Sequence, residues 1–348
     1  SNTKTIMGQA SNQYVAPTDI TDVFSTYLWD GINSSQSIVN GVDLSGEGGL
    51  TWIKLRNVND GHHLFDTERG SGKYLISNET GNESTSSVEL TSFNNNGFTY
   101  GNYGNGYDVA SWTFRKAPKF FDVVTWTGTG GTGSRTIAHN LGTTVGMLLV
   151  KRTSDAEDWT GYHRGVNGGV TPQNYKILIN STAAAASSAH WASTAPTTTT
   201  FTVSQYHNVS GATYVAYVFA HNNSDGTFGP DGDQDIIKCG SYTGNGSTDG
   251  PEINLGFEPQ WMLVKMSSAA GNDWIIQDTM RGFDNSPSIK QLYPNLSNAE
   301  SNVTASQMNV TPTGFKVTAT GSNYNASGYT YIYMAIRRGP LAPPTAGT

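Results

Sequence analysis

The chain has 348 residues, of which 14% are charged and 11% are aromatic, and its formal net charge is −7. This thinly spread negative charge excludes a generic nucleic-acid-binding surface, which needs clustered lysine and arginine. The sequence has no run of about 18 apolar residues that could span a membrane. Its single cysteine, Cys239, excludes a disulfide framework and a cysteine zinc site.

A set of sequence markers recurs three times in the same order, about every 100 residues. Each unit opens with an aromatic residue before a turn glycine and continues through an apolar run that ends in lysine. An Arg-Gly pair follows, then a phenylalanine, and a dense apolar strand closes the unit. The lysines are Lys54, Lys151 and Lys265, and the phenylalanines are Phe98, Phe201 and Phe315. This interval is too long for a stacked solenoid, so it predicts three tandem units.

Strand signals dominate the whole chain, because short runs rich in β-branched and aromatic residues alternate with Asn-Gly and Asp-Gly turns. The predicted fold is all-β, with three tandem β-sandwich or jelly-roll-like modules of about 100 residues each. The best helix candidate is the alanine-rich stretch 182–190. In chain order we expect an N-terminal arm (1–20), module 1 (21–118), module 2 (119–222), a linker (223–235), module 3 (236–338) and a proline-rich tail (339–348).

An Asp-Thr-x-Arg-Gly motif stands at residues 66–70 and again at 278–282. The middle repeat keeps an Arg-Gly pair at Arg164 but lacks the aspartate. One interpretation is a ligand-binding arginine. We favour an Asp–Arg pair that fixes one loop in each module, because recurrence in every module fits a requirement of the fold better than a specific site. The predicted loop-fixing residues are Asp66, Arg69, Arg164, Asp278 and Arg281.

Tryptophan beside aspartate recurs at Trp159 and Trp274, and Trp191 lies in a polar, turn-like stretch. Tryptophan next to polar groups suits sugar binding, because the ring covers a pyranose face while the polar groups bind its hydroxyls. These three residues are the candidate glycan-binding side chains. The alternative interpretation is a core tryptophan at a strand end.

Metal and enzyme signatures are weak or absent in the sequence. Residues 231–235 resemble the start of a calcium loop, but Ile236 and Tyr242 stand where such a loop needs glycine and glutamate. We therefore interpret this stretch as a solvated linker. No nucleophile elbow, phosphate loop or dinucleotide fingerprint occurs. We expect no catalytic residue, no metal and no cofactor.

Several longer sequence segments resemble a repeated module of structural proteins from marine and cyanobacterial bacteriophages. These segments are residues 22–28, 41–50, 64–70, 111–117, 137–142 and 242–246. The resemblance covers about residues 20–338 and implies a virion component of the tail-fibre or appendage type. It implies no catalytic residues.

The function expected from these observations is that of a non-enzymatic phage virion structural protein, of the fibre or appendage type, that contacts the host surface. We expect it on the virion surface, outside cells, as a homo-oligomer with other virion subunits and host-surface glycans as partners. Nucleic-acid binding and membrane insertion are not expected. The alternatives are a capsid-decorating or filament-forming subunit and a glycan-binding receptor module. A polysaccharide hydrolase is the least favoured.

Overall fold

The computed structural model describes residues 18–283, 285, 288–303 and 307–340. The expected N-terminal arm and C-terminal tail lie almost wholly outside these residues. The predicted all-β class is confirmed, because the described chain forms antiparallel sheets and its α-helices are two single turns. These helices are α1 (Ile20–Val23) and α2 (Leu44–Glu47).

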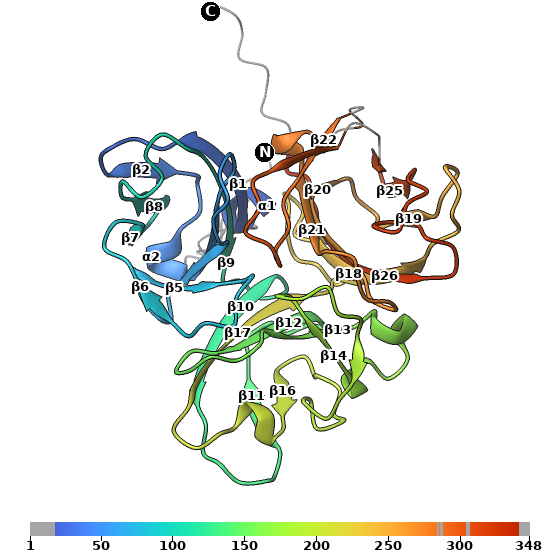
Figure 1. Cartoon of the computed structure of the whole chain (residues 1–348), viewed down its shortest axis with the longest axis horizontal. Coiled ribbons are helices and arrows are strands. Elements are labelled where there is room, and N and C mark those ends of the chain that lie inside the picture. The colour runs from blue at the N-terminus through green and yellow to red at the C-terminus, as the bar shows by residue number, and fades with distance from the viewer. Residues whose placement is uncertain (1–17, 284, 286–287, 304–306, 341–348) are drawn as a thin grey trace, which may run out of the picture.

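Figure 1 shows three lobes arranged around a common centre, which we call lobe 1 (24–115), lobe 2 (121–220) and lobe 3 (237–337). Lobe 1 has a large sheet of order β1-β9-β3-β4-β5-β6 and a small sheet β2-β8-β7. Its strands are β1 (Phe24–Asp30), β2 (Gln36–Val39), β3 (Gly49–Leu55), β4 (His63–Asp66), β5 (Lys73–Ile76), β6 (Ser84–Thr85), β7 (Leu90–Asn94), β8 (Gly97–Tyr100) and β9 (Asp108–Arg115).

Lobe 2 repeats this order as β10-β17-β12-β13-β14-β15, but its small sheet has only two strands, β11 and β16. Three short 3₁₀ turns, η1 to η3, lie between its strands. The elements are β10 (Phe121–Thr127), β11 (Arg135–Ala138), β12 (Val145–Arg152), β13 (Thr160–His163), η1 (Val166–Gly169), η2 (Pro172–Asn174), β14 (Tyr175–Leu178), β15 (Ala186–Ser187), β16 (Thr200–Val203), η3 (Gln205–His207) and β17 (Thr213–Ala220).

Lobe 3 has the large sheet β18-β26-β20-β21 and the small sheet β19-β25-β24. A separate pair, β22 and β23, is joined to the large sheet by a bridge between Ile276 and Leu292. The elements are β18 (Ile237–Thr243), β19 (Glu252–Asn254), β20 (Pro259–Met266), β21 (Ile275–Asp278), η4 (Thr279–Arg281), β22 (Ile289–Gln291), β23 (Ser301–Val303), β24 (Met308–Thr311), β25 (Gly314–Val317) and β26 (Thr330–Arg337).

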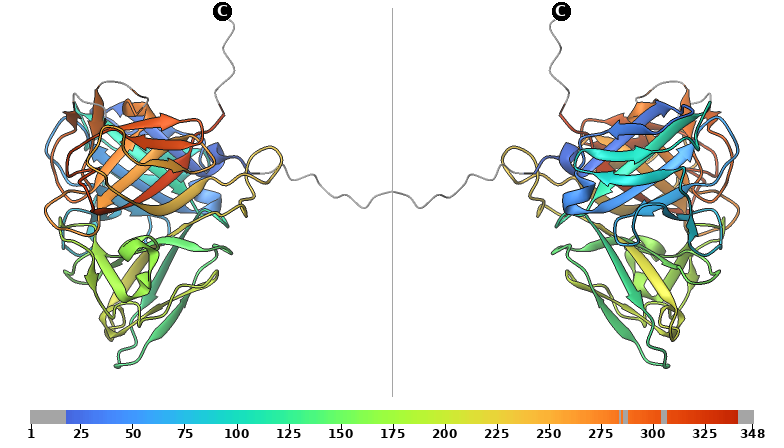
Figure 2. Two further views of the ribbon diagram at one scale, coloured as in Figure 1. Left: turned by 90° about the vertical axis from the view of Figure 1, so that its right-hand side faces the viewer. Right: turned by 90° about the vertical axis from the view of Figure 1, so that its left-hand side faces the viewer.

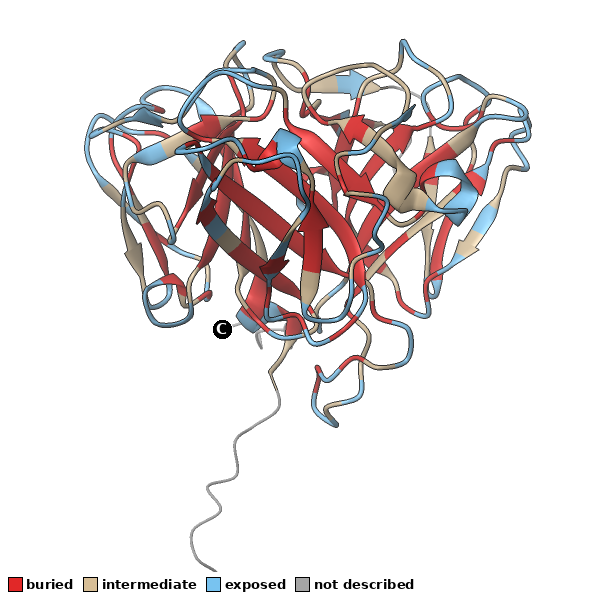
Figure 3. Ribbon diagram, turned by 90° about the horizontal axis from the view of Figure 1, so that it is seen from below, coloured by how far each residue is buried: buried red, intermediate tan, exposed pale blue. Residues whose placement is uncertain are grey.

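The closing strand of a lobe serves two cores at once. Along β26, Tyr331, Tyr333 and Ala335 pack inside lobe 3, while Ile332, Met334 and Ile336 point into a core at the centre of the molecule. Successive strand residues face opposite sides of a sheet, so a strand covered on both sides becomes apolar throughout. Buried strands therefore run through the middle of the molecule and exposed residues gather in the loops (Figure 3).

The central core joins all three lobes. The ring of Phe114 in lobe 1 lies 5.4 Å from Phe219 of lobe 2 and 5.8 Å from Trp261 of lobe 3, with edge-to-face geometry in both pairs. Aromatic pairs prefer this geometry. The three lobes are therefore packed into one folded unit.

Every lobe is entered and left at the same end of its large sheet. The first residue of the opening strand pairs near the end of the closing strand, as Phe24 does with Phe114 and Phe121 with Phe219. Lobe 3 repeats this with Ile237 and Ile336. We call this end the base and the opposite end the distal end. Both crossovers between lobes, and both ends of the described chain, lie at the base.

Two local expectations are modified by the structure, the linker in part and the helix wholly. Residues 223–235 are a folded loop that projects from the base on the same side as α1 (Figure 2). Phe228 in this loop is 2% exposed and packs against Phe120, and the Asp235 carboxylate accepts the N–H groups of Ser224 and Gly226. The segment thus connects lobes 2 and 3 as expected, and none of residues 231–235 is buried, but Phe228 anchors it to the base.

The stretch 182–190 forms no helix. It contains the short edge strand β15, in which Ala186 pairs with Lys176 of β14. Alanine favours helices intrinsically, but strand pairing with the neighbouring sheet overrides that weak preference here.

Candidate functional site

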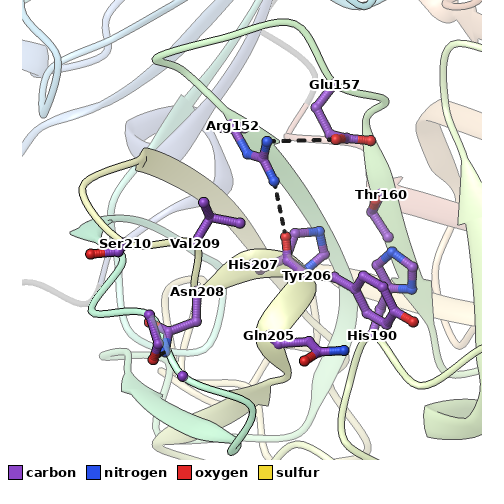
Figure 4. Close-up of a pocket in the computed structure, with 12 residues that line it drawn as sticks. Arg152, Glu157, Thr160, His190, Gln205, Tyr206, His207, Asn208, Val209 and Ser210 are labelled. Carbon is purple, nitrogen blue, oxygen red and sulfur yellow. Dashed lines mark hydrogen bonds and ion pairs between the residues drawn. The ribbon is translucent and has the colours of Figure 1, made fainter.

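The distal end of lobe 2 holds a pocket of about 520 Å³ (Figure 4). It lies between the ends of β12 and β13 and the loop 204–212 that joins β16 to β17. Its lining residues are Gly130, Gly131, Arg152, Glu157, Thr160, His190, Gln205, Tyr206, His207, Asn208, Val209 and Ser210. A volume of this size accommodates a small ligand, since small-molecule sites span about 300–1,000 Å³.

A stacked aromatic pair forms one wall of the pocket. Tyr206 is 48% exposed, and its ring stacks on His190 with centroids 4.5 Å apart and planes 16° apart. The Ser204 hydroxyl accepts the Tyr206 N–H, and the Ser188 hydroxyl contacts His190 Nδ1. Burial lowers the pKa of His190 to about 4, so this imidazole is neutral at pH 7.

Arg152, at the end of β12, ties the rim together. Its Nη1 lies 3.0 Å from Asp155 Oδ1 and 3.7 Å from Glu157 Oε2. Its Nη2 donates to the Tyr206 carbonyl at 3.4 Å. The guanidinium therefore fixes the loop 204–212 against β12.

The Asn208 side chain holds the opposite wall. It is 4% exposed, accepts the Thr129 N–H at 3.0 Å and donates to the Gly130 carbonyl at 2.9 Å. These bonds lock the loop 204–212 to the loop 128–134. The pocket is therefore preformed, which lowers the entropy lost on binding.

One residue of the pocket lining differs in size from its counterpart in lobe 1. The strand register places Thr160, His63 and Ile275 at corresponding positions of the three lobes. In lobe 1 the His63 imidazole contacts the Glu89 carboxylate and stacks on Tyr74 at 4.7 Å, which fills the space. The smaller Thr160 leaves the corresponding space in lobe 2 open.

The three tryptophans expected to contact glycans are all buried. Trp159, Trp191 and Trp274 are 0%, 1% and 1% exposed, respectively. Their indole N–H groups donate to the carbonyls of Ile76, Tyr175 and Leu178 at 2.9, 2.9 and 2.8 Å. A buried ring offers no face to a sugar, so the glycan-binding prediction is wrong for these residues. Trp159 and Trp274 instead bond to the preceding lobe.

The two Asp–Arg pairs lie at the seams between lobes. Asp66 contacts Arg69 Nε and accepts the hydroxyl of Tyr217, from lobe 2, at 2.8 Å. In lobe 3, Asp278 accepts Arg281 Nε at 2.7 Å and the indole N–H of Trp112, from lobe 1, at 2.9 Å. Each carboxylate thus binds its own loop and a neighbouring lobe. The sequence motif did not show this second contact.

The middle repeat replaces this aspartate with His163. Where the other seams present Tyr217 or Trp112, lobe 3 presents Met334, which donates no hydrogen bond. His163 Nε2 instead donates to the Tyr333 carbonyl at 3.0 Å. A buried carboxylate here would lack the donor from a neighbouring lobe that Tyr217 or Trp112 supplies at the other seams, which is consistent with the missing aspartate.

Arg164 is not the counterpart of Arg69 and Arg281. It follows His163 directly, whereas those arginines stand three residues after their aspartates. Its Nη1 lies 2.8 Å from His221 Nε2 and donates to the Cys239 carbonyl at 3.2 Å. The Arg-Gly dipeptide of the middle repeat is therefore not equivalent to the Arg-Gly dipeptides of the other two repeats.

We expect His163→Asp to lower the free energy of unfolding by about 1–3 kcal/mol, because the new buried carboxylate would find no donor on Met334. Urea denaturation measures this change. Adding Met334→Tyr should restore part of the loss, since its hydroxyl would recreate the bond that Tyr217 makes to Asp66. No loss in the single variant would contradict this account of the seam.

The recurrent lysines have no exposed surface. Lys54, Lys151 and Lys265 are each 0% exposed, and burial lowers the pKa of each to about 8. Lys151 Nζ donates to the Thr80 carbonyl of lobe 1 at 3.1 Å and to the Arg152 carbonyl at 2.9 Å. These ammonium groups are held by carbonyl oxygens at the distal ends of the sheets.

Among residues 18–283, 285, 288–303 and 307–340, no cluster of three or more His, Cys, Asp or Glu side chains could hold a metal ion. No helix in the described part of the chain is both long and apolar enough to cross a membrane.

Fold and pocket together define an all-β, three-lobed protein with a preformed polar pocket at its distal end. A family model described as "Domain of unknown function (DUF7483)" matches residues 19–340, so the chain belongs to this family. The match spans all three lobes. A comparison with curated proteins found none that matches.

Proposed function

We propose that the chain is a non-enzymatic structural protein of the virion fibre or appendage type, which contacts a host-surface saccharide through the lobe 2 pocket. The observation that carries this proposal is that the ends of the described chain and the pocket lie at opposite ends of the molecule. Entry, exit and both crossovers lie at the base, while the preformed pocket opens at the distal end. Such a molecule attaches at one end and recognises at the other.

The chemistry of the pocket supports a saccharide ligand. Tyr206 is exposed and its ring stacks on His190, and Glu157 and Gln205 supply polar groups in the same pocket lining. Sugars are bound by this combination of an aromatic face and a few placed hydrogen-bonding groups. The resemblance of several sequence segments to phage structural proteins is the reason for proposing a place on a virion surface.

We also infer that the chain consists of three tandem β-sandwich modules. The three large sheets share a strand order, and Lys54, Lys151 and Lys265 stand opposite corresponding residues of the closing strands. Several copies of the chain, joined at the base to other virion subunits, would gain avidity from modest individual sites. A capsid-decorating or filament-forming subunit is the alternative.

Two variants test the pocket by different means. Tyr206→Ala removes the exposed ring, and Thr160→His introduces the side chain that fills the corresponding space in lobe 1. We expect each to weaken binding to saccharide-coated surfaces and host cells about tenfold or more, equivalent to about 1.4 kcal/mol. Surface plasmon resonance with the folded variants measures this loss.

Tyr103→Ala is the matched control. Tyr103 is 37% exposed and lies in the corresponding loop of lobe 1. It stands two residues after Gly101, whose N–H donates to the Glu89 carbonyl, just as Tyr206 stands two residues after Ser204, whose N–H donates to the His190 carbonyl. We expect this control to bind like the unmodified chain. Binding that survives both lobe 2 substitutions, or is lost equally in the control, would refute the proposed site.

A further inference from the structure

We infer that the lobe 2 pocket selects uncharged saccharides and discriminates against sugars that carry a carboxylate or sulfate. This inference rests on the proposed function and names the ligand class of the same pocket. It follows from the charges in the pocket lining, where the Arg152 guanidinium is paired with carboxylates and the two imidazoles are neutral.

The guanidinium in the lining is already paired. Arg152 contacts Asp155 at 3.0 Å and lies 3.7 Å from Glu157, and both carboxylates stand at the rim, 54% and 46% exposed. Recognition of an anion by arginine relies on free donors that meet two oxygens at once. Here an incoming anion would have to displace Asp155 and would still face Glu157.

The two imidazoles in the lining do not replace that charge. His190 and His207 lie with centroids 5.1 Å apart and, at 3% exposure, His207 is more deeply buried than its neighbour. Burial holds the pKa of His207 well below its usual value, as it does for His190. Lys176 is near enough to lower both pKa values, but it does not line the pocket.

The groups that remain for a ligand suit hydroxyls. Gln205 and Ser210 are exposed and donate or accept, and the Glu157 carboxylate accepts. A sugar hydroxyl can donate to Glu157, whereas a sugar carboxylate is repelled by it and loses its water without gaining a cation. The same arrangement therefore favours a neutral pyranose and disfavours its uronic acid.

Matched sugar pairs test this inference. The methyl glycosides of glucose, galactose and mannose are compared with the methyl glycosides of the corresponding uronic acids, which differ only at C6. Each is used at pH 7 as a competitor of saccharide-surface binding. We expect at least one neutral glycoside to compete, with its uronate at least tenfold weaker. Glu157→Gln should reduce this difference in affinity, because it should strengthen binding of the uronate.

The outcomes separate the two claims. A uronate that competes as well as or better than its neutral partner would overturn the inference and leave the proposed function standing. A gap that is unchanged in Glu157→Gln would also overturn it, since the repelling carboxylate would then play no part. Failure of all neutral and acidic glycosides to compete would count against the saccharide pocket itself.

Discussion

Replacing Asp278 with alanine is expected to lower the free energy of unfolding by about 3–5 kcal/mol, the usual cost of removing one partner from a buried ion pair. Asp278 is 1% exposed, and the Arg281 side chain is completely buried. The substitution would leave the Arg281 Nε and the indole N–H of Trp112 without their acceptor. It would also open the seam between lobes 3 and 1.

Equilibrium urea denaturation measures this loss, and Asp249→Ala is its control. Asp249 also pairs with a basic residue, Lys316, but its side chain is 86% exposed. Exposed pairs contribute less than about 1 kcal/mol, so the control should change stability little. Equal effects of the two substitutions would show that the seam contacts do not stabilise the fold.

Raising the pH from 7 to 9 should stabilise the protein, in contrast to most proteins. The buried lysines Lys54, Lys151 and Lys265 have a pKa of about 8 in the folded state, against about 10.4 when unfolded. Between these values the unfolded chain binds more protons, so stability rises with pH. At pH 9 each lysine contributes about 1.4 kcal/mol relative to pH 7.

Cys239 acts in the opposite direction. Burial raises the pKa of its thiol to about 12, so the unfolded chain loses that proton first. The contribution of this thiol to stability therefore falls as pH rises above about 8.5. The expected net gain at pH 9 is therefore about 3 kcal/mol. Denaturation midpoints at pH 7, 8 and 9 and constant ionic strength measure it.

A lysine variant isolates the cause of this pH effect. Lys151→Met should remove about 1.4 kcal/mol, nearly half of the net rise, whatever its effect on stability at pH 7. A flat or falling pH profile in the unmodified chain, or an unchanged slope in the variant, would contradict the assignment to the buried lysines.

Much of the fold was readable from sequence periodicity. Runs such as 147–151 and 261–265 are short, apolar and bounded by turns, which is typical of strands covered on both sides. The recurrent lysines and phenylalanines fall at corresponding register positions, because each repeat places the same side chains at the same points of its sheets. Packing of the lobes on one another was not predictable, since a strand pattern does not say what covers each face.

The candidate site was less predictable, for two physical reasons. Trp159 and Trp274 stand beside aspartates in sequence, but their rings are buried between lobes, and a single sequence does not distinguish a buried ring from an exposed one. The pocket is lined by Thr160, which is smaller than His63 at the corresponding position of lobe 1. That difference becomes visible only when the register aligns two lobes of low similarity.

The proposal that the protein attaches at its base and binds at its distal end is tested most directly by tethering the protein in two orientations. Cys239 is buried, so an introduced surface cysteine would react selectively. Asp231→Cys tethers the base loop, and Thr132→Cys tethers the distal loop beside the lobe 2 pocket. Both positions are exposed.

The two tethered forms are compared for capture of host cells and saccharide-coated particles. We predict capture by the base-tethered form and at least tenfold less by the distally tethered form. Equal capture in both orientations, or stronger capture by the distally tethered form, would contradict the proposal that binding takes place at the distal end.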